Sequence, residues 1–152
     1  MRTTLRLITA LTLSLLTGAV LAGESSAITT ATLISQGELQ LQNNDIDGAI
    51  ATLTKAIEQE PNSSLAHTRL GGAYLLGQRY DNAIGQFQQA IGLDANNASA
   101  FIGMGIAYLH SNRLGAAKAA LGEGKRLAPD TANQIDDLIN RVEQRSGVPP
   151  HQ

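Results

Sequence analysis

Residues 64–97 read SLAHTRLGGAYLLGQRYDNAIGQFQQAIGLDANN, and residues 98–131 read ASAFIGMGIAYLHSNRLGAAKAALGEGKRLAPDT. Aligned without gaps, both stretches have glycine at the eighth position, tyrosine at the eleventh and alanine at the twentieth. The preceding stretch, residues 30–63, reads TATLISQGELQLQNNDIDGAIATLTKAIEQEPNS and shares the glycine and the alanine. Three ungapped copies of one pattern at a period of 34 residues indicate a repeat architecture.

The shared positions alternate between small and large side chains. Glycine or alanine at a contact between two helices lets the backbones approach closely, and large side chains around the contact fill the remaining space. Proline cannot continue a helix, so it marks a helix end. The residues that we predict to pack the repeats are Gly37, Ala49, Leu53, Ala56, Pro61, Leu70, Gly71, Tyr74, Ala83, Phe87, Ala90, Met104, Gly105, Tyr108, Ala117, Leu121 and Pro129.

Short polar segments divide each repeat into two helices. These turns lie at 43–45, 78–79 and 111–113, and Asp45 is suited to cap the helix that follows it. The pattern predicts helices at about 31–43, 46–59, 64–77, 80–93, 98–111 and 114–127.

This pattern resembles the tetratricopeptide repeat, which has Leu-Gly at positions 7–8, Tyr at 11, Ala at 20, Phe at 24, Ala at 27 and Pro at 32. The resemblance covers residues 30–131 and implies an all-α, right-handed superhelical solenoid of three helix-turn-helix repeats, at 30–63, 64–97 and 98–131. The chain departs from the pattern at Gln36 and Gln40, where Leu and Tyr are expected, and at His67, which replaces an aromatic residue. The two glutamines predict that the first helix is loosely packed or meets a partner.

A further helix is expected after the repeats, at residues 132–146. Asp130 and Thr131 can cap its start, and Gly147 with the following prolines ends it before a flexible tail at 147–152. Helical spacing places Ile135, Leu138, Ile139 and Val142 on one face and Asp136, Asp137, Arg141, Glu143 and Arg145 on the other. Such a helix is suited to cover the exposed end of a solenoid.

The first 22 residues have the pattern of a secretory signal peptide. Arg2 and Arg6 precede an uncharged apolar run, and small residues follow at the end of that run. Cleavage after Ala22 leaves a short N-terminal segment at 23–29, and Ala27 is a second candidate position. The predicted location is periplasmic or secreted; the alternative is an uncleaved membrane anchor with the repeats facing the periplasm.

Composition argues against catalysis and against nucleic-acid binding. The chain has no cysteine, three histidines and a net charge of −2 from 11 basic and 13 acidic residues. Thiolate chemistry and disulfides are therefore excluded, and no basic surface for nucleic acid is indicated. His67 is interpreted as a packing residue and His110 as a helix-end residue. We predict no enzyme activity, no cofactor and no metal site.

The family resemblance places positions 2, 5, 9, 12 and 13 of each repeat on the concave face. None of these residues is Lys or Arg, so the carboxylate clamp of chaperone-binding members is absent and an apolar helix or extended segment is the expected ligand. The resemblance thus implies a protein-interaction adaptor or scaffold that assists assembly of an envelope complex. The alternatives are a self-associating structural protein, whose groove is filled by its own chain or another copy, and a shifted helix phase that leaves some of these residues in the interior. The predicted groove residues are Ile34, Glu38, Leu41, Leu65, Thr68, Leu75, Leu76, Ile102, Ile106 and Leu109.

Overall fold

The computed structural model describes residues 18–147, and their side chains from residue 29 onward. All regular structure in this range is helical. From α2 onward every helix begins and ends within one residue of the predicted bounds. The elements are α1 (Gly18–Gln42), α2 (Ile46–Gln59), α3 (Ser64–Leu76), α4 (Tyr80–Leu93), α5 (Ala98–His110), α6 (Leu114–Leu127), a 3-10 turn at Pro129–Thr131 and α7 (Ala132–Ser146).

The start of α1 differs from the prediction, because α1 begins at Gly18 rather than near residue 31. No proline interrupts this stretch, so the backbone hydrogen-bond ladder continues through it. The two predicted cleavage positions and the predicted segment 23–29 lie within α1, whereas residues 1–17 of the predicted signal peptide and residues 148–152 of the predicted tail lie outside the described residues. Among the described helices, none has both the length and the apolar character of a membrane span.

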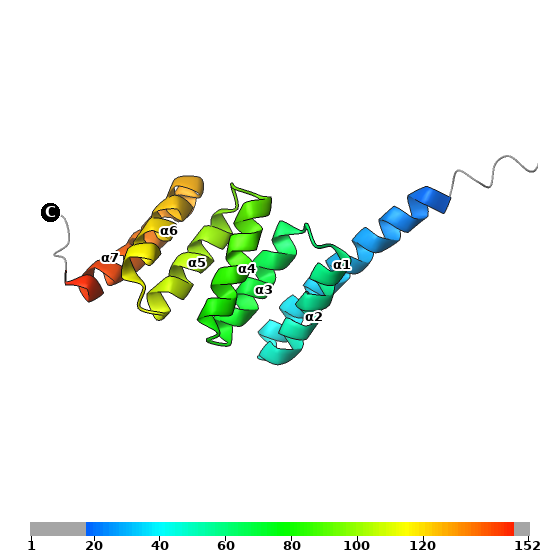
Figure 1. Ribbon diagram of the computed structural model, residues 1–152, viewed down its shortest axis with the longest axis horizontal. Coiled ribbons are helices and arrows are strands. Elements are labelled where there is room, and N and C mark those ends of the chain that lie inside the picture. Colours follow the sequence, from blue (N-terminus) through cyan, green and yellow to red (C-terminus); the bar gives the residue numbers. More distant parts are fainter. Residues whose placement is uncertain (1–17, 148–152) are drawn as a thin grey trace, which may run out of the picture.

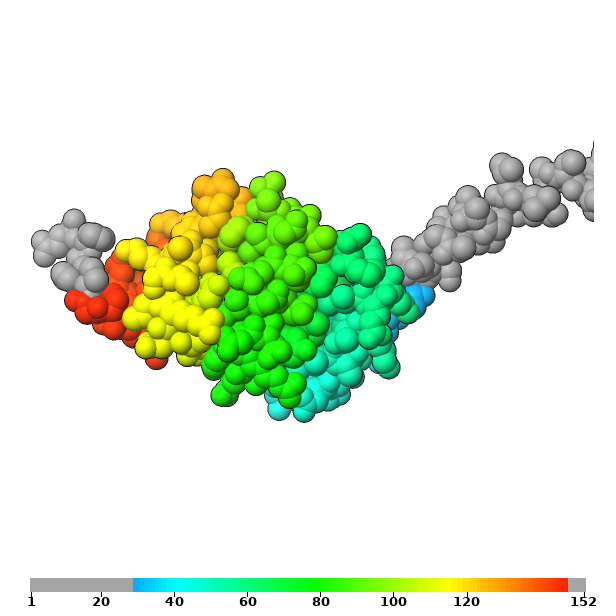
Figure 2. All heavy atoms as spheres, in the orientation of Figure 1, coloured from blue at the N-terminus to red at the C-terminus, as the bar shows by residue number. Residues whose placement is uncertain are grey.

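The helices pack in chain order as α1–α2, α3–α4 and α5–α6, and α7 packs on α6 (Figure 1). The odd-numbered helices also contact one another: α1 contacts α3, α3 contacts α5, and α5 contacts α7. The described residues of α2, α4 and α6 make no such contacts with one another. A two-layer stack whose odd helices lie closer together curves toward the odd layer. The result is the predicted all-α superhelical solenoid, with α1, α3, α5 and α7 on the inner side. Figure 2 shows one face of the body, where the chain forms successive bands in sequence order from teal through green to yellow and orange.

The glycines at the eighth position set the closest approach within each helix pair. A Cβ atom added to Gly37 would lie 2.6 Å from Leu53, one on Gly71 2.7 Å from Phe87, and one on Gly105 2.7 Å from Leu121. The partners are the residues at the twenty-fourth position. Only glycine leaves room for them, since real Cβ contacts are not this short. The predicted contact between the two helices of each pair is confirmed at these residues.

The turns within the pairs share one backbone conformation. Asn44, Gln78 and Asn112 have φ angles of 61°, 59° and 60°, which place each in the left-handed region. The Asp45 side chain accepts from the Gly48 N–H at 3.0 Å, so the predicted cap is present. Ion pairs repeat at the same register, from Arg79 to Asp47 at 2.7 Å and from Arg113 to Asp81 at 2.5 Å. They join one pair of helices to the next.

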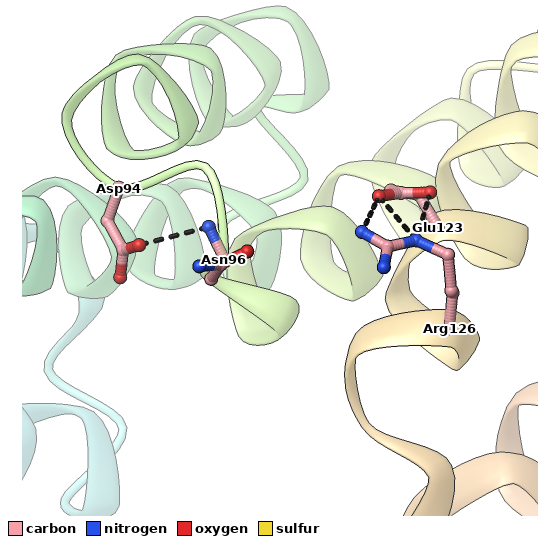
Figure 3. Close-up of polar contacts among 4 residues, drawn as sticks. All are labelled: Asp94, Asn96, Glu123 and Arg126. Atoms are coloured by element: carbon pink, nitrogen blue, oxygen red, sulfur yellow. Dashed lines mark hydrogen bonds and ion pairs between the residues drawn. The ribbon is translucent and has the colours of Figure 1, made fainter.

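Two local contacts on the outer surface appear in Figure 3. The Asp94 carboxylate accepts from the backbone N–H of Asn96 at 3.0 Å and stabilises the turn between α4 and α5. Farther along the chain, the Arg126 guanidinium donates to both carboxylate oxygens of Glu123. These hydrogen bonds lower the pKa of Glu123 and raise that of Arg126.

His67 and His110 occupy the positions predicted for them, a packing position and a helix end. His67 is buried, with Nδ1 2.8 Å from the Gln86 side-chain oxygen and Nε2 3.0 Å from the Pro61 carbonyl oxygen. His110 ends α5, and its ring stacks on Tyr80 with the centroids 5.3 Å apart. The first therefore fills the interior of a helix pair, and the second covers a helix end.

Two details predicted for the last helix are wrong. Glu143 does not face solvent: it is 7% exposed, and Lys118 of α6 donates to its carboxylate at 2.6 Å. Helix α7 contacts both α5 and α6, so the part of its surface that is buried is wider than the single aliphatic face that was predicted. Thr131 occupies the cap position of α7 without capping it, because its hydroxyl donates to the Ala128 carbonyl at 3.0 Å. Gly147 ends α7 with a φ of 71°, as expected for a helix-terminating glycine.

Candidate partner-binding groove

Three of the ten predicted groove residues lie in the interior. Ile34, Thr68 and Leu109 are 7%, 7% and 6% exposed. The Thr68 hydroxyl donates to the Ser64 carbonyl and accepts from the Asn97 side chain, both at 2.8 Å. These residues join neighbouring helices, which agrees with the alternative that part of the set is interior.

The other aliphatic residues of the set retain accessible surface. Leu65 and Leu76 of α3 are 50% and 58% exposed, which is high for leucine on a folded protein. The remaining four are half-buried: Leu41, Leu75, Ile102 and Ile106. Sequence reasoning missed two further exposed leucines, Leu39 and Leu93. The inner layer therefore offers an apolar surface that is discontinuous rather than a complete stripe.

Of the polar residues Gln36, Glu38 and Gln40 of α1, only Glu38 and Gln40 form a hydrogen bond or ion pair with another side chain that the structure describes. Glu38 forms an ion pair with Arg69 of α3, so its charge is neutralised where α1 meets α3. The Gln40 amide nitrogen donates to Asp45 at 3.3 Å, whereas its Oε1 is buried with no hydrogen-bond partner among the described residues. Gln36 is exposed. Gln36 therefore lies outside the interior, where Leu70 of the second repeat is buried, and Gln40 keeps one buried oxygen without a partner in the described part of the chain.

A concavity lies between α5 and α7. It has a volume of about 440 Å³, within the range of small-ligand pockets. Aliphatic residues dominate its wall, and two arginines and a histidine supply positive or titratable groups. The lining residues are Ile106, Leu109, His110, Leu138, Arg141, Gln144 and Arg145.

The contribution of α7 to this pocket follows from its register. Helices α3, α5 and α7 begin at residues 64, 98 and 132. The starting positions are spaced by the repeat period, so α7 occupies the place of a first helix in a following repeat and joins the inner layer. Sequence reasoning assigned it only to covering the end of the solenoid. Continuing the period past residue 131 would have placed α7 in the inner layer, but the groove positions of the resemblance then fall on 133, 136, 140, 143 and 144, of which only Gln144 lines the pocket.

The arginines of α7 reach the C-terminal end of α5. Arg145 Nη1 donates to the Leu109 carbonyl at 3.1 Å. This carbonyl also accepts from the Asn112 backbone N–H at 3.2 Å, and it belongs to the last turn of α5, where a cation is favourable. Arg145 thus anchors α7 on α5 while its guanidinium lines the pocket.

No arrangement for metal binding appears in the described part of the chain: no three His, Asp or Glu side chains gather there. The polar groups of the pocket are two guanidinium groups, an imidazole and an amide, with no carboxylate or hydroxyl among them. Such groups suit recognition of an anion or a polar chain segment better than proton transfer or nucleophilic attack.

Two models of the tetratricopeptide repeat match the chain, one over residues 34–98 and the other over residues 76–142. No curated protein sequence gives a significant match. Several solved structures share the fold. The TPR2B-domain:pHsp70 complex of yeast Sti1 is 19% identical with a TM-score of 0.75, over 78% of this chain and 98% of that one.

The first TPR of Spaghetti (RPAP3), bound to the HSP90 peptide SRMEEVD, is also 19% identical with a TM-score of 0.75, over 78% of this chain and 94% of that one. The Yersinia enterocolitica type III secretion translocator chaperone SycD, in an alternative dimer, is 15% identical with a TM-score of 0.73 over the same shares. At these identities the likeness concerns the fold.

Proposed function

Since the chain belongs to the tetratricopeptide-repeat family, we propose that it is a non-catalytic adaptor that binds a segment of another protein along its inner helix layer. The observation that carries this proposal is the accessible apolar surface of the inner layer, which consists of the exposed leucines of α3, the half-buried Ile106 of α5 and the aliphatic wall of the α5–α7 pocket. Solved relatives of the same fold are described in complexes with Hsp70 and HSP90 peptides. That use of the fold supports a peptide or helix as the ligand.

The available surface is sufficient for a specific contact. Burying one exposed aliphatic side chain contributes about 1.5–3 kcal/mol, whereas association costs about 4–15 kcal/mol before any net affinity appears. Leu65 and Leu76 alone would therefore not hold a partner. Together with the half-buried Leu75, Ile106 and the pocket wall they can, which favours a ligand long enough to cross α3, α5 and α7.

Export is part of the proposal. The basic start, apolar run and small-residue end of residues 1–22 support a signal peptide and a periplasmic or secreted protein. An adaptor in that compartment would assist assembly of an envelope complex. Cell fractionation and the intact mass of the mature chain test this: cleavage after residue 22 or 27 is expected, whereas a full-length product in the membrane fraction would favour the anchor.

Site-specific photo-cross-linking tests the binding surface. A benzophenone amino acid replaces Leu76 of α3 in one variant and Leu93 of α4 in the matched control, because both leucines are exposed but lie in different layers. Adducts with another protein are expected for the Leu76 variant and not for the Leu93 variant. Equal adducts from both positions, or none from either, would contradict the proposal.

The alternative is self-association through the same surface. One solved structure of this fold is described as a dimer. Light scattering over a range of concentrations distinguishes the two functions. A monomer at all concentrations excludes self-association, and a dimer that Leu76→Glu dissociates would replace the adaptor proposal.

A further inference from the structure

The cations of the described chain are unequally neutralised. Residues 29–147 contain nine Lys and Arg side chains, of which six form ion pairs. The remaining three are Lys55, Arg141 and Arg145, and two of them line the α5–α7 pocket. Most cations of the described residues are therefore paired internally, whereas two arginines beside the α5–α7 concavity form no ion pair.

These two arginines are arranged to meet an anion. Residues four apart on a helix lie on one face, about 5–6 Å apart at their Cβ atoms. Arg141 and Arg145 of α7 have this spacing, and like charges so placed repel each other. Asp137, four positions before Arg141, lies on the same face of α7 but forms no ion pair with it. Arg145 uses one donor on the Leu109 carbonyl. Arg141 makes no hydrogen bond or ion pair with a described residue.

The rest of the pocket is apolar. Ile106 and Leu109 of α5 and Leu138 of α7 form its wall, and the volume of about 440 Å³ accommodates large side chains. A purely electrostatic ligand, such as a phosphate, would leave this wall uncovered. A ligand that combines an apolar side chain with carboxylates covers the wall and pairs with both arginines.

We propose that the α5–α7 pocket binds an acidic amphipathic helix of another protein. One aliphatic or aromatic side chain enters the pocket, and two side-chain carboxylates one helical turn apart pair with Arg141 and Arg145. The proposal rests on the adaptor function proposed above and specifies the class of partner. A terminal carboxylate supplies a single charge, so side-chain carboxylates match two separate guanidinium groups better.

A second copy of this chain fits the pocket poorly. The chain has 13 acidic residues, and no two of them are three or four positions apart in the sequence. None of its helices can therefore present carboxylates on adjacent turns of one face. The required spacing must come from a different protein.

A peptide selection tests this inference on the full chain. The probe is a library of random dodecapeptides displayed at the N-terminus of a phage coat protein, so that no peptide has a free C-terminal carboxylate. Selection is carried out on the wild type, on Arg141→Glu and on Lys55→Glu. Lys55→Glu is the matched control, because it changes the net charge equally at an exposed, unpaired lysine outside the pocket.

The expected result is enrichment of peptides with Asp or Glu three or four positions apart beside Leu, Ile or Phe. For an amidated synthetic copy of a selected peptide, fluorescence anisotropy should show at least about tenfold weaker binding to Arg141→Glu and an unchanged Kd with Lys55→Glu. Replacement of its acids by Gln should weaken binding to the wild type to a similar extent.

Other outcomes overturn one proposal or both. Enrichment of apolar peptides without paired acids, or equal binding to Arg141→Glu and the wild type, overturns the acidic-helix inference and leaves the adaptor proposal standing. No enrichment above the blank support, for any variant, overturns both. Concentration-dependent dimers that Arg141→Glu dissociates would assign the pocket to a second copy and overturn the inference as well.

Discussion

Gly71 and Gly72 are neighbours on α3 with opposite surroundings, and substitution of each by alanine tests the packing of the solenoid. A Cβ atom on Gly71 would lie 2.7 Å from Cε1 and 2.8 Å from Cδ1 of Phe87. The ring cannot move freely to the other side, because Gly103 of α5 already lies so close that its own added Cβ would be 2.4 Å from the ring. A Cβ atom on Gly72 meets nothing within 4 Å.

The expected difference in free energy of unfolding follows from two terms. Replacing glycine by alanine within a helix stabilises by about 1 kcal/mol at either position. Overpacking a buried contact costs about 1–3 kcal/mol, and this cost applies only to Gly71→Ala. The propensity term cancels in the comparison, so Gly71→Ala should be about 1–3 kcal/mol less stable than Gly72→Ala. The latter should be more stable than the wild type.

Urea unfolding followed by circular dichroism at 222 nm measures this difference. Adding Phe87→Leu to each alanine variant completes a double-mutant cycle, because the shorter side chain removes the ring atoms nearest to Gly71. The gap between the two alanine variants should then narrow. Equal stabilities of Gly71→Ala and Gly72→Ala would refute the assignment of Phe87 to a space that glycine at the eighth position keeps open.

Two further predictions concern the turns and the surface. Gln78→Gly should raise the free energy of unfolding by about 0.5–1 kcal/mol, because Gln78 has a φ of 59° and glycine adopts this conformation without the side-chain penalty. Asn44 has an equivalent φ of 61°, but asparagine tolerates this conformation. Asn44→Gly should therefore raise the free energy of unfolding by less in the same urea assay. Carbon-13 NMR titration should show the Glu123 carboxyl titrating below its ordinary pKa of 4.5 in the wild type, since Arg126 donates to it, and near that value in Arg126→Gln. The stabilisation from this pair is therefore present above about pH 4.5 and is lost as the pH falls through the lowered pKa, and an unchanged titration in Arg126→Gln would contradict the assigned cause.

The repeated parts of the fold were predictable from the sequence because the same packing pattern occurs in all three repeats. Glycine at the eighth position and a large residue at the twenty-fourth require each other sterically, as Gly105 and Leu121 show. The helix bounds after residue 45 were equally accessible, because polar turns recur at the same positions. The early start of α1 was not, since residues 18–29 contain neither a repeat position nor a proline to mark a boundary.

The surroundings of α7 were less predictable because they depend on two neighbouring helices at once. A single amphipathic stripe assigned Glu143 to solvent, whereas contact with both α5 and α6 buries it beside Lys118. The contact of α7 with α5 forms the pocket that Arg141 and Arg145 line. Burial of Ile34 and Thr68 likewise arises from packing between repeats, which positions within one repeat do not reveal.

Direction and specificity in such a solenoid must come from residues that break the repeat. Apolar contacts are not directional, so a ligand held by them alone could shift its register or bind in reverse at little cost. The α7 arginines have no counterpart among the predicted groove residues of α3 and α5, and the acidic groove residue Glu38 lies on α1 and is already paired with Arg69. Among the described residues of the groove and the pocket, only Arg141 and Arg145 of α7 carry a positive charge that no ion pair neutralises. An acidic helix would therefore bind there in one register, and the apolar residues of α3 and α5 would add affinity without choosing the partner.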